Sequence, residues 1–200
     1  MILGLIPARG GSKRLPRKNV RMLCGRPLIA WTIIEAKRAG RLDRVVVTTE
    51  DDEIAEMTAR YYGCAVIRRP AHMASDLCSI YHCILLACAR AGPAYDVLTL
   101  LHPTSPLRLA EDIDAVTALC VDQVTVPAAI SVETGKDVPN AAVYSGRVSW
   151  LRDGGCFDDP SLLRYEMPAE RSVDINTLED FERAEAEMKK RIAPVDAMFG

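Results

Sequence analysis

The sequence predicts an α/β fold in which one doubly wound, mainly parallel sheet lies between two layers of helices, a three-layer α/β/α arrangement. Three observations predict it. The chain of 200 residues opens on an unbroken apolar run, "ILGLIP", typical of a strand buried on both faces of a parallel sheet. Strand-like and helix-like segments then alternate four times. The composition, 49% hydrophobic, suits a single domain with an ample core.

The elements of the first half follow in order. We expect a strand over residues 2–7, a helix opened by Pro27 and ended by Gly40, and a second strand in "DRVVVTTE". "DDEIAEMTARYYG" carries acids in its first turn and a glycine at its end, as helices do, and "CAVIRRP" suits a third strand. A helix over 77–91 and a strand in "YDVLTLLHP" complete this half.

The second half is less regular. Residues 110–120 indicate a helix, "DQVTVPAAIS" an extended segment, and "AAVYSGRVSW" a hairpin that turns at Ser145 and Gly146. Thr177 and Asp180 form a capping-box pattern that begins a helix with Leu178, Phe181, Ala184 and Met188 on one stripe. The residues after Ile192 have no clear pattern.

Composition excludes several classes of protein. The net charge is −2 and the sequence pI is near 6.0, which argues against a protein that coats nucleic acid. No apolar run reaches about 18 residues, and the first residues lack the features of a secretory signal, so we expect a soluble, cytoplasmic protein without a membrane partner. The seven cysteines are scattered and contain no CxxC pair, which favours neither a disulfide framework nor a zinc site.

A cationic loop follows the first strand. Arg9, Lys13, Arg14, Arg17, Lys18 and Arg21 stand within thirteen residues that contain no acid. Ligands of open α/β sheets lie outside the carboxyl ends of the strands, and this loop begins at such an end. Gly10 and Gly11 let backbone N–H groups approach a polyphosphate, whose charge the Arg and Lys side chains neutralise. The spacing is not that of a Walker A loop, and a plain solvated cationic loop is the alternative.

Two further segments carry candidate chemistry. "HPTSPLR" places two prolines around Thr104 and Ser105, with Arg108 close behind, and it is either a binding loop or a structural turn. "VDINT" places Asp174 and Asn176 on one side of an extended chain before a helix. Two such oxygen-bearing side chains can share Mg²⁺, although the pattern is also common at helix entries.

Four motifs in this order, "IPARGGSKRLPRKN", "RPAHMASD", "LLHPTSPLR" and "DINTLEDFERAE", closely resemble those of the acylneuraminate cytidylyltransferases, the CMP-sialic acid synthetase family. The resemblance covers nearly the whole chain. It implies a Rossmann-like nucleotidyltransferase fold and the transfer of CMP from CTP to the hydroxyl of a small acidic acceptor, with release of pyrophosphate and Mg²⁺ as cofactor.

The resemblance also implies roles for individual residues. The catalytic residues would be Arg9, Lys18 and Asp174, with Asp174 and Asn176 as the metal ligands. The acceptor would contact His102, Thr104, Ser105 and Arg108. The nucleotide would contact Arg9, Gly10, Gly11, Ser12, Lys13, Lys18 and Asn19 through the loop, and Arg69, Ala74 and Ser75 around the cytosine. In-line attack on the α-phosphorus would need positioning and charge neutralisation, without a covalent intermediate.

The chain departs from the family pattern near the acceptor. His102 stands in place of the usual Gln, Asn176 in place of the second Asp of a DxD pair, and Val138 in place of an Arg. The interval between "HPTSPLR" and "VPNAAVY" is shortened, so we expect a single domain over 1–200 with a reduced β-hairpin appendage around 130–170, as a monomer or an atypical homodimer. Three functions stay open: CMP transfer to a sialic-acid-like nonulosonate, CMP transfer to a small phosphonate, and a non-catalytic nucleotide-binding protein.

Overall fold

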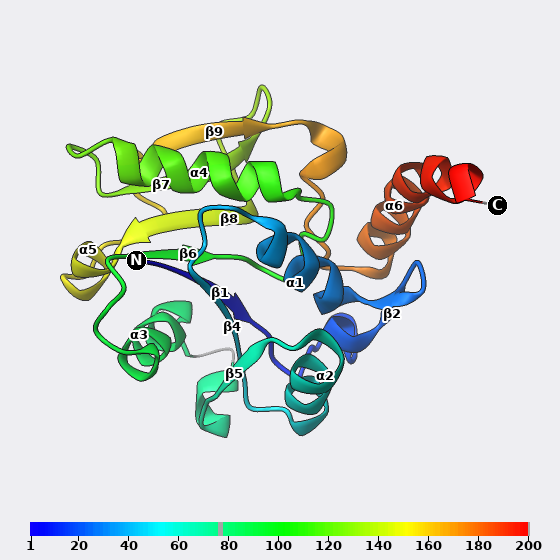
Figure 1. Ribbon diagram of the computed structural model, residues 1–200, viewed down its shortest axis with the longest axis horizontal. Helices are drawn as coiled ribbons and strands as arrows, with labels where there is room; N and C mark the ends of the chain where they lie inside the picture. The colour runs from blue at the N-terminus through cyan, green and yellow to red at the C-terminus, as the bar shows by residue number, and fades with distance from the viewer. Residues whose placement is uncertain (76–77, 200) are drawn as a thin grey trace.

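A seven-stranded sheet forms the centre of the computed structural model, which describes residues 1–75 and 78–199, with side chains described through residue 193 (Figure 1). The strand order is β5-β4-β1-β6-β8-β7-β9. The strands are β1 (Ile2–Pro7), β4 (Arg44–Thr49), β5 (Ala65–Arg68), β6 (Val97–Leu100), β7 (Ala128–Glu133), β8 (Pro139–Arg147) and β9 (Leu163–Met167). β8 pairs antiparallel with both neighbours, and the other pairings are parallel, so the prediction of a mainly parallel sheet is confirmed.

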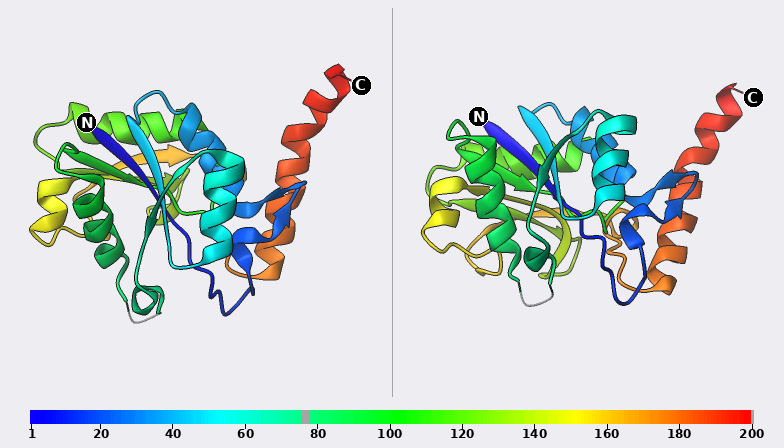
Figure 2. Two further views of the ribbon diagram at one scale, coloured as in Figure 1. Left: turned by 60° about the horizontal axis from the view of Figure 1, so that its bottom comes forward. Right: turned by 90° about the horizontal axis from the view of Figure 1, so that it is seen from below.

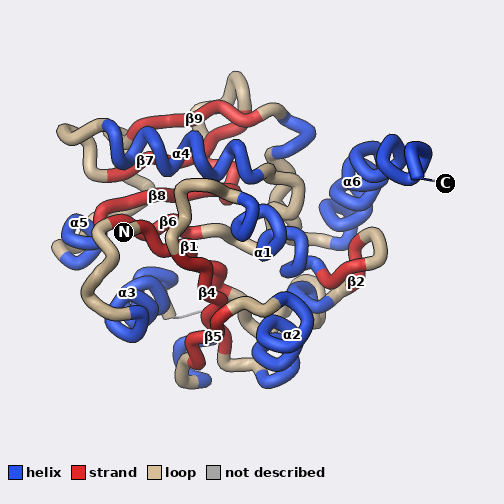
Figure 3. The backbone as a smooth tube through the Cα atoms, viewed as in Figure 1, coloured by secondary structure: helices blue, strands red, loops and turns tan. Residues whose placement is uncertain are grey.

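Helices cover both faces of this sheet, as predicted (Figures 2 and 3). On one face lie α1 (Leu28–Arg38), α2 (Asp52–Tyr62) and α4 (Ala110–Asp122), whose apolar side chains share a core with Ile6 and Val47. On the other face lie α3 (Ile80–Ala91) and α5 (Val148–Arg152), which pack on a core that contains Leu3 and Leu5. Successive β1 residues point to opposite faces, so this one strand supplies both cores.

Local signals explain where the first helices begin and end. The Asp51 side chain accepts a hydrogen bond from the backbone N–H of Ile54 and so caps α2, which ends at Gly63 in the left-handed region with φ of 54°. Ser79 caps α3 by accepting from the N–H of Tyr81. The predicted start of that helix, Leu77, lies outside the described residues, and the helix begins at Ile80.

The prediction of a hairpin turn at Ser145 and Gly146 is wrong. Both residues lie inside the unbroken strand β8, where they pair with Thr99 and Leu98 of β6. The Ser145 hydroxyl is buried and lies 3.1 Å from that of Thr99, so its polarity is satisfied inside the sheet. The hairpin instead joins β7 to β8, and the chain between them contains Gly135 with φ of 76°.

The segment around 130–170, expected as a reduced appendage, contributes β8, β9 and most of β7 to the same sheet. β9 and the short helix α5 are elements that the sequence patterns did not reveal. β9 pairs in parallel with β7 at the edge of the sheet.

A smaller layer lies beside α1. The two-stranded sheet of β2 (Met22–Leu23) and β3 (Arg26–Pro27) and the helix α6 (Leu178–Phe199) share a third core with Trp31. The predicted capping box is present, because the N–H of Asp180 donates to the Thr177 hydroxyl and the Asp180 carboxylate accepts from the N–H of Thr177. The helix continues past Ile192 to Phe199, where no pattern was recognised.

The strand order places a topological switch point between β1 and β6. The chain leaves β1 toward β4 on one side, while β6 lies on the other, so the loops after these strands diverge at the carboxyl edge of the sheet. Such a divergence leaves room for a ligand. Three short 3-10 helices, η1 (Lys18–Val20), η2 (Ala71–Ala74) and η3 (Ala169–Arg171), lie in the connecting loops.

Candidate active site

A cleft of about 320 Å³ lies where the loops after β1, β5 and β6 meet. Most of the predicted site residues line it: Arg9, Ser12, Lys13, Lys18, Asn19, Arg69, Ala74, Ser75, His102, Thr104 and Asn176. The residues come from four segments that are far apart in the sequence, which the fold brings together at one edge of the sheet. Arg14, Met73, Cys78 and Cys83 also line the cleft and were not predicted as site residues.

The cleft is strongly cationic. Its lining includes Arg9, Lys13, Arg14, Lys18 and Arg69, and no Asp or Glu among the described lining residues. Burial lowers the pKa of Lys18, an effect that the nearby Asp174 carboxylate opposes. Arg9, Lys13, Arg14 and Lys18 suit the cleft to a phosphorylated ligand, since each can make a charge-assisted hydrogen bond to phosphate oxygens.

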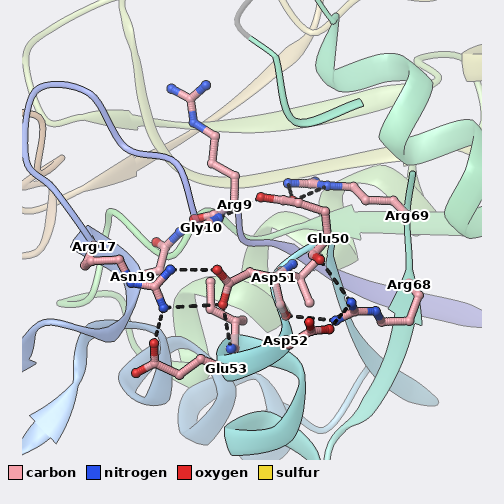
Figure 4. Close-up of polar contacts among 12 residues, drawn as sticks. Arg9, Gly10, Arg17, Asn19, Glu50, Asp51, Asp52, Glu53, Arg68 and Arg69 are labelled. Carbon is pink, nitrogen blue, oxygen red and sulfur yellow. Dashed lines mark hydrogen bonds and ion pairs between the residues drawn. The ribbon is translucent and has the colours of Figure 1, made fainter. Parts of the chain in front are cut away.

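The cationic loop is tied down at both of its ends. Asn19 is buried, and its Nδ2 donates to the backbone oxygen of Arg9 over 2.8 Å, which closes the loop on itself. Arg17 adopts a left-handed backbone with φ of 53°, and its guanidinium binds the carboxylates of Asp51 and Glu53 (Figure 4). These contacts therefore fix the position of the loop residues beside the cleft.

Gly10 contacts Glu50 and packs closely against the start of α2. Its N–H donates to Glu50 Oε1 over 2.7 Å, so it is engaged by the protein in this structure. A Cβ at this position would overlap the Asp51 carboxylate, with Asp51 Cγ only 2.8 Å away. Glycine is therefore required for close packing against the start of α2. Gly11 is exposed, does not line the cleft, and a Cβ there would meet nothing within 4 Å.

Glu50 is a residue that the sequence analysis missed. It follows β4, directly between the strands that lead to the cationic loop and to Arg69. Its Oε2 accepts from Arg69 Nε over 3.0 Å and from Arg69 Nη2 over 2.9 Å (Figure 4). Its position in the sequence indicates this role, because an acid that directly follows a buried strand lies at the carboxyl edge of the sheet. There it can accept hydrogen bonds from residues that follow the neighbouring strands.

The "HPTSPLR" segment separates into a half-buried part that lines the cleft and a fully buried part. His102 and Thr104 line the cleft, whereas Ser105 and Arg108 are fully buried and do not. Neither side chain lies at the cleft in this structure, and their contact with an acceptor stays a prediction. The Arg108 guanidinium donates to the Thr32 hydroxyl and to the backbone oxygen of His102, so it supports the segment from below.

The environment of His102 favours its neutral form. Its ring lies 5.6 Å from the ring of Tyr144, centroid to centroid. Burial, together with the charge of Arg108, lowers the pKa of His102 to about 4. His102 is therefore uncharged near neutral pH and can both donate and accept one hydrogen bond at the cleft.

Asp174 and Asn176 form a linked pair. Asn176 Nδ2 donates to Asp174 Oδ2 over 2.6 Å, and Asn176 Oδ1 accepts from Arg14 Nη2 over 2.9 Å. Asp174 itself does not line the cleft, and its Oδ1 is enclosed without a hydrogen-bond partner. The backbone N–H of Ile175 donates to the backbone oxygen of Thr104, and Lys18 Nζ donates to the backbone oxygen of Ile175. Hydrogen bonds therefore join this segment to the His102 loop and to the cationic loop.

The family model for cytidylyltransferases matches residues 3–127. The chain belongs to the cytidylyltransferase family. The match covers β1, the cationic loop, Arg69 and the His102 segment, and it ends before Asp174. The matched residues supply all of the cleft lining described above except Asn176.

Curated relatives carry related names. The chain is 35% identical over 156 residues to the CMP-N,N'-diacetyllegionaminic acid synthase of Legionella pneumophila, covering 76% of this chain and 62% of the relative. It is 37% identical to a pseudaminic acid cytidylyltransferase of Campylobacter jejuni, covering 52% of this chain and 47% of the relative. A 3-deoxy-manno-octulosonate cytidylyltransferase of Acidobacterium capsulatum is 32% identical, with 92% and 81% covered. The chain thus spans about half to three fifths of the length of the first two relatives.

Solved structures share the fold. A CMP:2-keto-3-deoxy-manno-octonic acid synthetase, whose structure is a complex with CTP, aligns with a TM-score of 0.77 and 17% identity, covering 95% of this chain and 99% of that one. A cytidylyltransferase from Leptospira borgpetersenii aligns with a TM-score of 0.69 and 21% identity, covering 92% and 84%. At these identities the likeness shows the Rossmann-like nucleotidyltransferase fold, which was predicted.

Proposed function

We propose that this chain transfers CMP from CTP to the hydroxyl of a small acidic acceptor and releases pyrophosphate. The observation that carries the proposal is the cationic cleft at the switch point of the sheet, formed by a member of the cytidylyltransferase family. A triphosphate needs several cations in one place, and Arg9, Lys13 and Lys18 meet there on one loop.

The nucleotide would lie across the cleft. Its triphosphate would lie along the cationic loop, with Arg9 and Lys18 neutralising the charge that develops on the departing pyrophosphate. Its base would lie on the opposite side, between Arg69 and the short helix η2, where Ala74 and Ser75 line the wall. The rigid ties of the loop hold these groups in place before the ligand arrives, which lowers the entropic cost of binding.

The acceptor would enter beside His102 and Thr104. A sialic-acid-like nonulosonate is the acceptor that we propose, because relatives are named for legionaminic and pseudaminic acids. Neutral His102 would hydrogen-bond to a sugar hydroxyl, while the Arg108 guanidinium below holds the backbone of the segment. The acceptor hydroxyl would then attack the α-phosphorus in line with the leaving pyrophosphate.

The residues around Asp174 fit a divalent cation such as Mg²⁺. The enclosed Asp174 Oδ1 lacks a partner, and an orphaned carboxylate oxygen beside a phosphate-binding cleft is the kind of group that a hard cation satisfies. Asn176 offers an amide oxygen next to it, although that oxygen is engaged by Arg14. A bound Mg²⁺ would supply charge neutralisation for the phosphate oxygens. Among the side chains of residues 1–75 and 78–193, no cluster of three or more His, Cys, Asp or Glu offers another metal site.

We also propose where the protein works and with which partners. Among the described residues, none of the helices combines the length and the apolar character that a membrane span requires. We propose a cytoplasmic enzyme, since the cysteines are free thiols of the kind that a reducing compartment maintains. We also propose that it works without nucleic acid or membrane. A monomer or an atypical homodimer is expected, and sedimentation velocity over a range of concentrations tests this.

Isothermal titration calorimetry of CTP binding, followed in the wild type and in Lys18→Ala, tests the nucleotide half. Loss of one charge-assisted contact predicts about 10- to 100-fold weaker binding of CTP in Lys18→Ala. Lys37→Ala is the matched control, because Lys37 lies on α1 and donates to the backbone of residues 62 and 63, away from the cleft. Equal affinity in all three proteins would show that the loop is only a solvated surface.

A further inference from the structure

Glu50 contacts both walls of the cleft with one carboxylate. Its Oε1 accepts the N–H of Gly10, at the base of the cationic loop, over 2.7 Å. Its Oε2 accepts Nε and Nη2 of Arg69, on the opposite wall, over 3.0 and 2.9 Å. Figure 4 shows Glu50 between these two groups. We propose that Glu50 is a positioning residue that couples the phosphate-binding loop to the base-binding wall, an inference that rests on the proposed function.

Burial makes this link rigid. The side chains of Arg69 and Glu50 are only 4% and 14% exposed, so water has little access to replace either partner. A bidentate guanidinium–carboxylate pair also fixes the plane of the guanidinium. Arg69 Nη1 donates to Cys83 Sγ over 3.4 Å, and all three guanidinium nitrogens are therefore engaged. The face that Arg69 presents to the cleft is thus set by Glu50.

The neighbouring acids have other partners. Asp51 caps α2 and binds Arg17, Asp52 binds Arg68, and Glu53 binds Arg17 (Figure 4). Among these four consecutive acids, Glu50 alone has described contacts to both Gly10 and Arg69. The difference provides a control, because Asp52 is a neighbour in the chain but binds Arg68, and its side chain is 96% exposed.

The geometry predicts what a neutral amide would do. In Glu50→Gln, one terminal atom becomes an NH₂ donor, which satisfies neither the Gly10 N–H nor the Arg69 guanidinium. The amide oxygen can therefore accept a hydrogen bond from the Gly10 N–H or from the Arg69 guanidinium, and the NH₂ group repels the other donor. Since the two walls bind the two ends of the nucleotide, their misalignment weakens a ligand that spans both ends more than it weakens either end alone.

The experiment measures binding of CTP, CMP and inorganic triphosphate by calorimetry to the wild type, Glu50→Gln and Asp52→Asn. We expect CTP binding to weaken at least tenfold in Glu50→Gln and to stay within twofold in Asp52→Asn. CMP and triphosphate should each weaken less than CTP does. Circular dichroism and thermal unfolding establish that the variants are folded, and a loss of stability alone would leave the affinity of the folded protein unchanged.

Glu50→Asp is the second variant, in case Glu50→Gln does not fold. It keeps the charge but shortens the side chain by one methylene, so the carboxylate no longer reaches both Gly10 and Arg69. We therefore expect at least fivefold weaker CTP binding with near-normal binding of triphosphate alone. Wild-type affinity for CTP in a folded Glu50 variant would overturn the inference. A wild type that binds neither CTP nor triphosphate would overturn the proposed function instead.

Discussion

Asn176 shows how one side-chain atom changes the character of the site. An amide at this position donates to Asp174 and accepts from Arg14, two contacts that a carboxylate cannot combine. The amide therefore holds the pair together through a hydrogen bond, without a second carboxylate. Such a pair carries a single negative charge, which limits its attraction for a metal.

Asn176→Asp should strengthen divalent-cation binding and lower the stability of the cation-free protein. A second carboxylate adds a hard ligand for Mg²⁺, but without a cation it lies against Asp174 and repels it. We expect a higher melting temperature on Mg²⁺ addition and a several-fold lower Mg²⁺ requirement for CTP binding than in the wild type. Asp174→Asn is the comparison, and it should lose the Mg²⁺ effect altogether. An identical Mg²⁺ titration in wild type and Asn176→Asp would argue against a ligand at this position.

His102 makes the folded protein sensitive to acid. Its pKa is about 4 in the folded chain, lowered by burial and by Arg108 and Lys18, although Asp174 acts in the opposite direction. The ordinary value is about 6.5, so the unfolded chain binds more protons between these two values. This contribution to stability is fully present above about pH 6.5 and is lost as the pH falls toward 4.

His102→Gln should therefore flatten the pH dependence of stability. Between pH 7.5 and 5.0, the free energy of unfolding should fall by about 1–2 kcal/mol less in His102→Gln than in the wild type. Urea unfolding at the two pH values measures this difference. His72→Gln serves as control, since His72 is exposed on η2 and should leave the wild-type dependence in place. A His102→Gln protein with the full wild-type loss would mean that His102 already titrates near its ordinary pKa.

At the scale of elements, the cationic loop depends on how it packs against the start of α2. Gly10 fits against Asp51 only because it has no side chain, whereas Gly11 faces open space. The two glycines are adjacent and look equivalent in the sequence. The packing partner that distinguishes them, Asp51, lies forty-one residues further along the chain.

Gly10→Ala should damage the loop, and Gly11→Ala should not. The added methyl group of Gly10→Ala overlaps the Asp51 carboxylate and pushes Gly10 away from Glu50, so we expect CTP binding to weaken about tenfold or more. Stability should fall by about 1–3 kcal/mol, as is usual for overpacking. Calorimetry and thermal unfolding of both variants measure the two effects. Similar behaviour of the two alanine variants would show that the loop tolerates displacement from α2.

The elements that the sequence predicted are those with their own local signals. The buried strands and the capped helices of residues 2–70 were recognised from apolar runs and end residues, and they are present. β8 was misread because Ser145 and Gly146 are typical turn residues, while burial between β6 and β7 decides their conformation. β9, "LRYEM", carries little apolar signal and forms through its pairing with a strand more than thirty residues away.

At the scale of the whole molecule, sheet order converts scattered motifs into one cleft. The motifs predicted which strand ends matter, and Arg9, Arg69 and His102 do meet there. What the motifs did not reveal is depth, since Arg108 and Ser105 lie beneath the surface that His102 and Thr104 form. Depth depends on packing between elements, and a linear pattern of residue types does not record it.

Pyrophosphate release from CTP is the measurement that decides whether the protein transfers CMP. The assay contains Mg²⁺ and, one at a time, nonulosonic acids, an eight-carbon keto-deoxy sugar acid, small phosphonates, or no acceptor. We expect release that requires a nonulosonic acid and disappears in Asp174→Asn. Release with a phosphonate alone would contradict the proposed acceptor, and tight CTP binding without release in any mixture would contradict the proposed transfer of CMP.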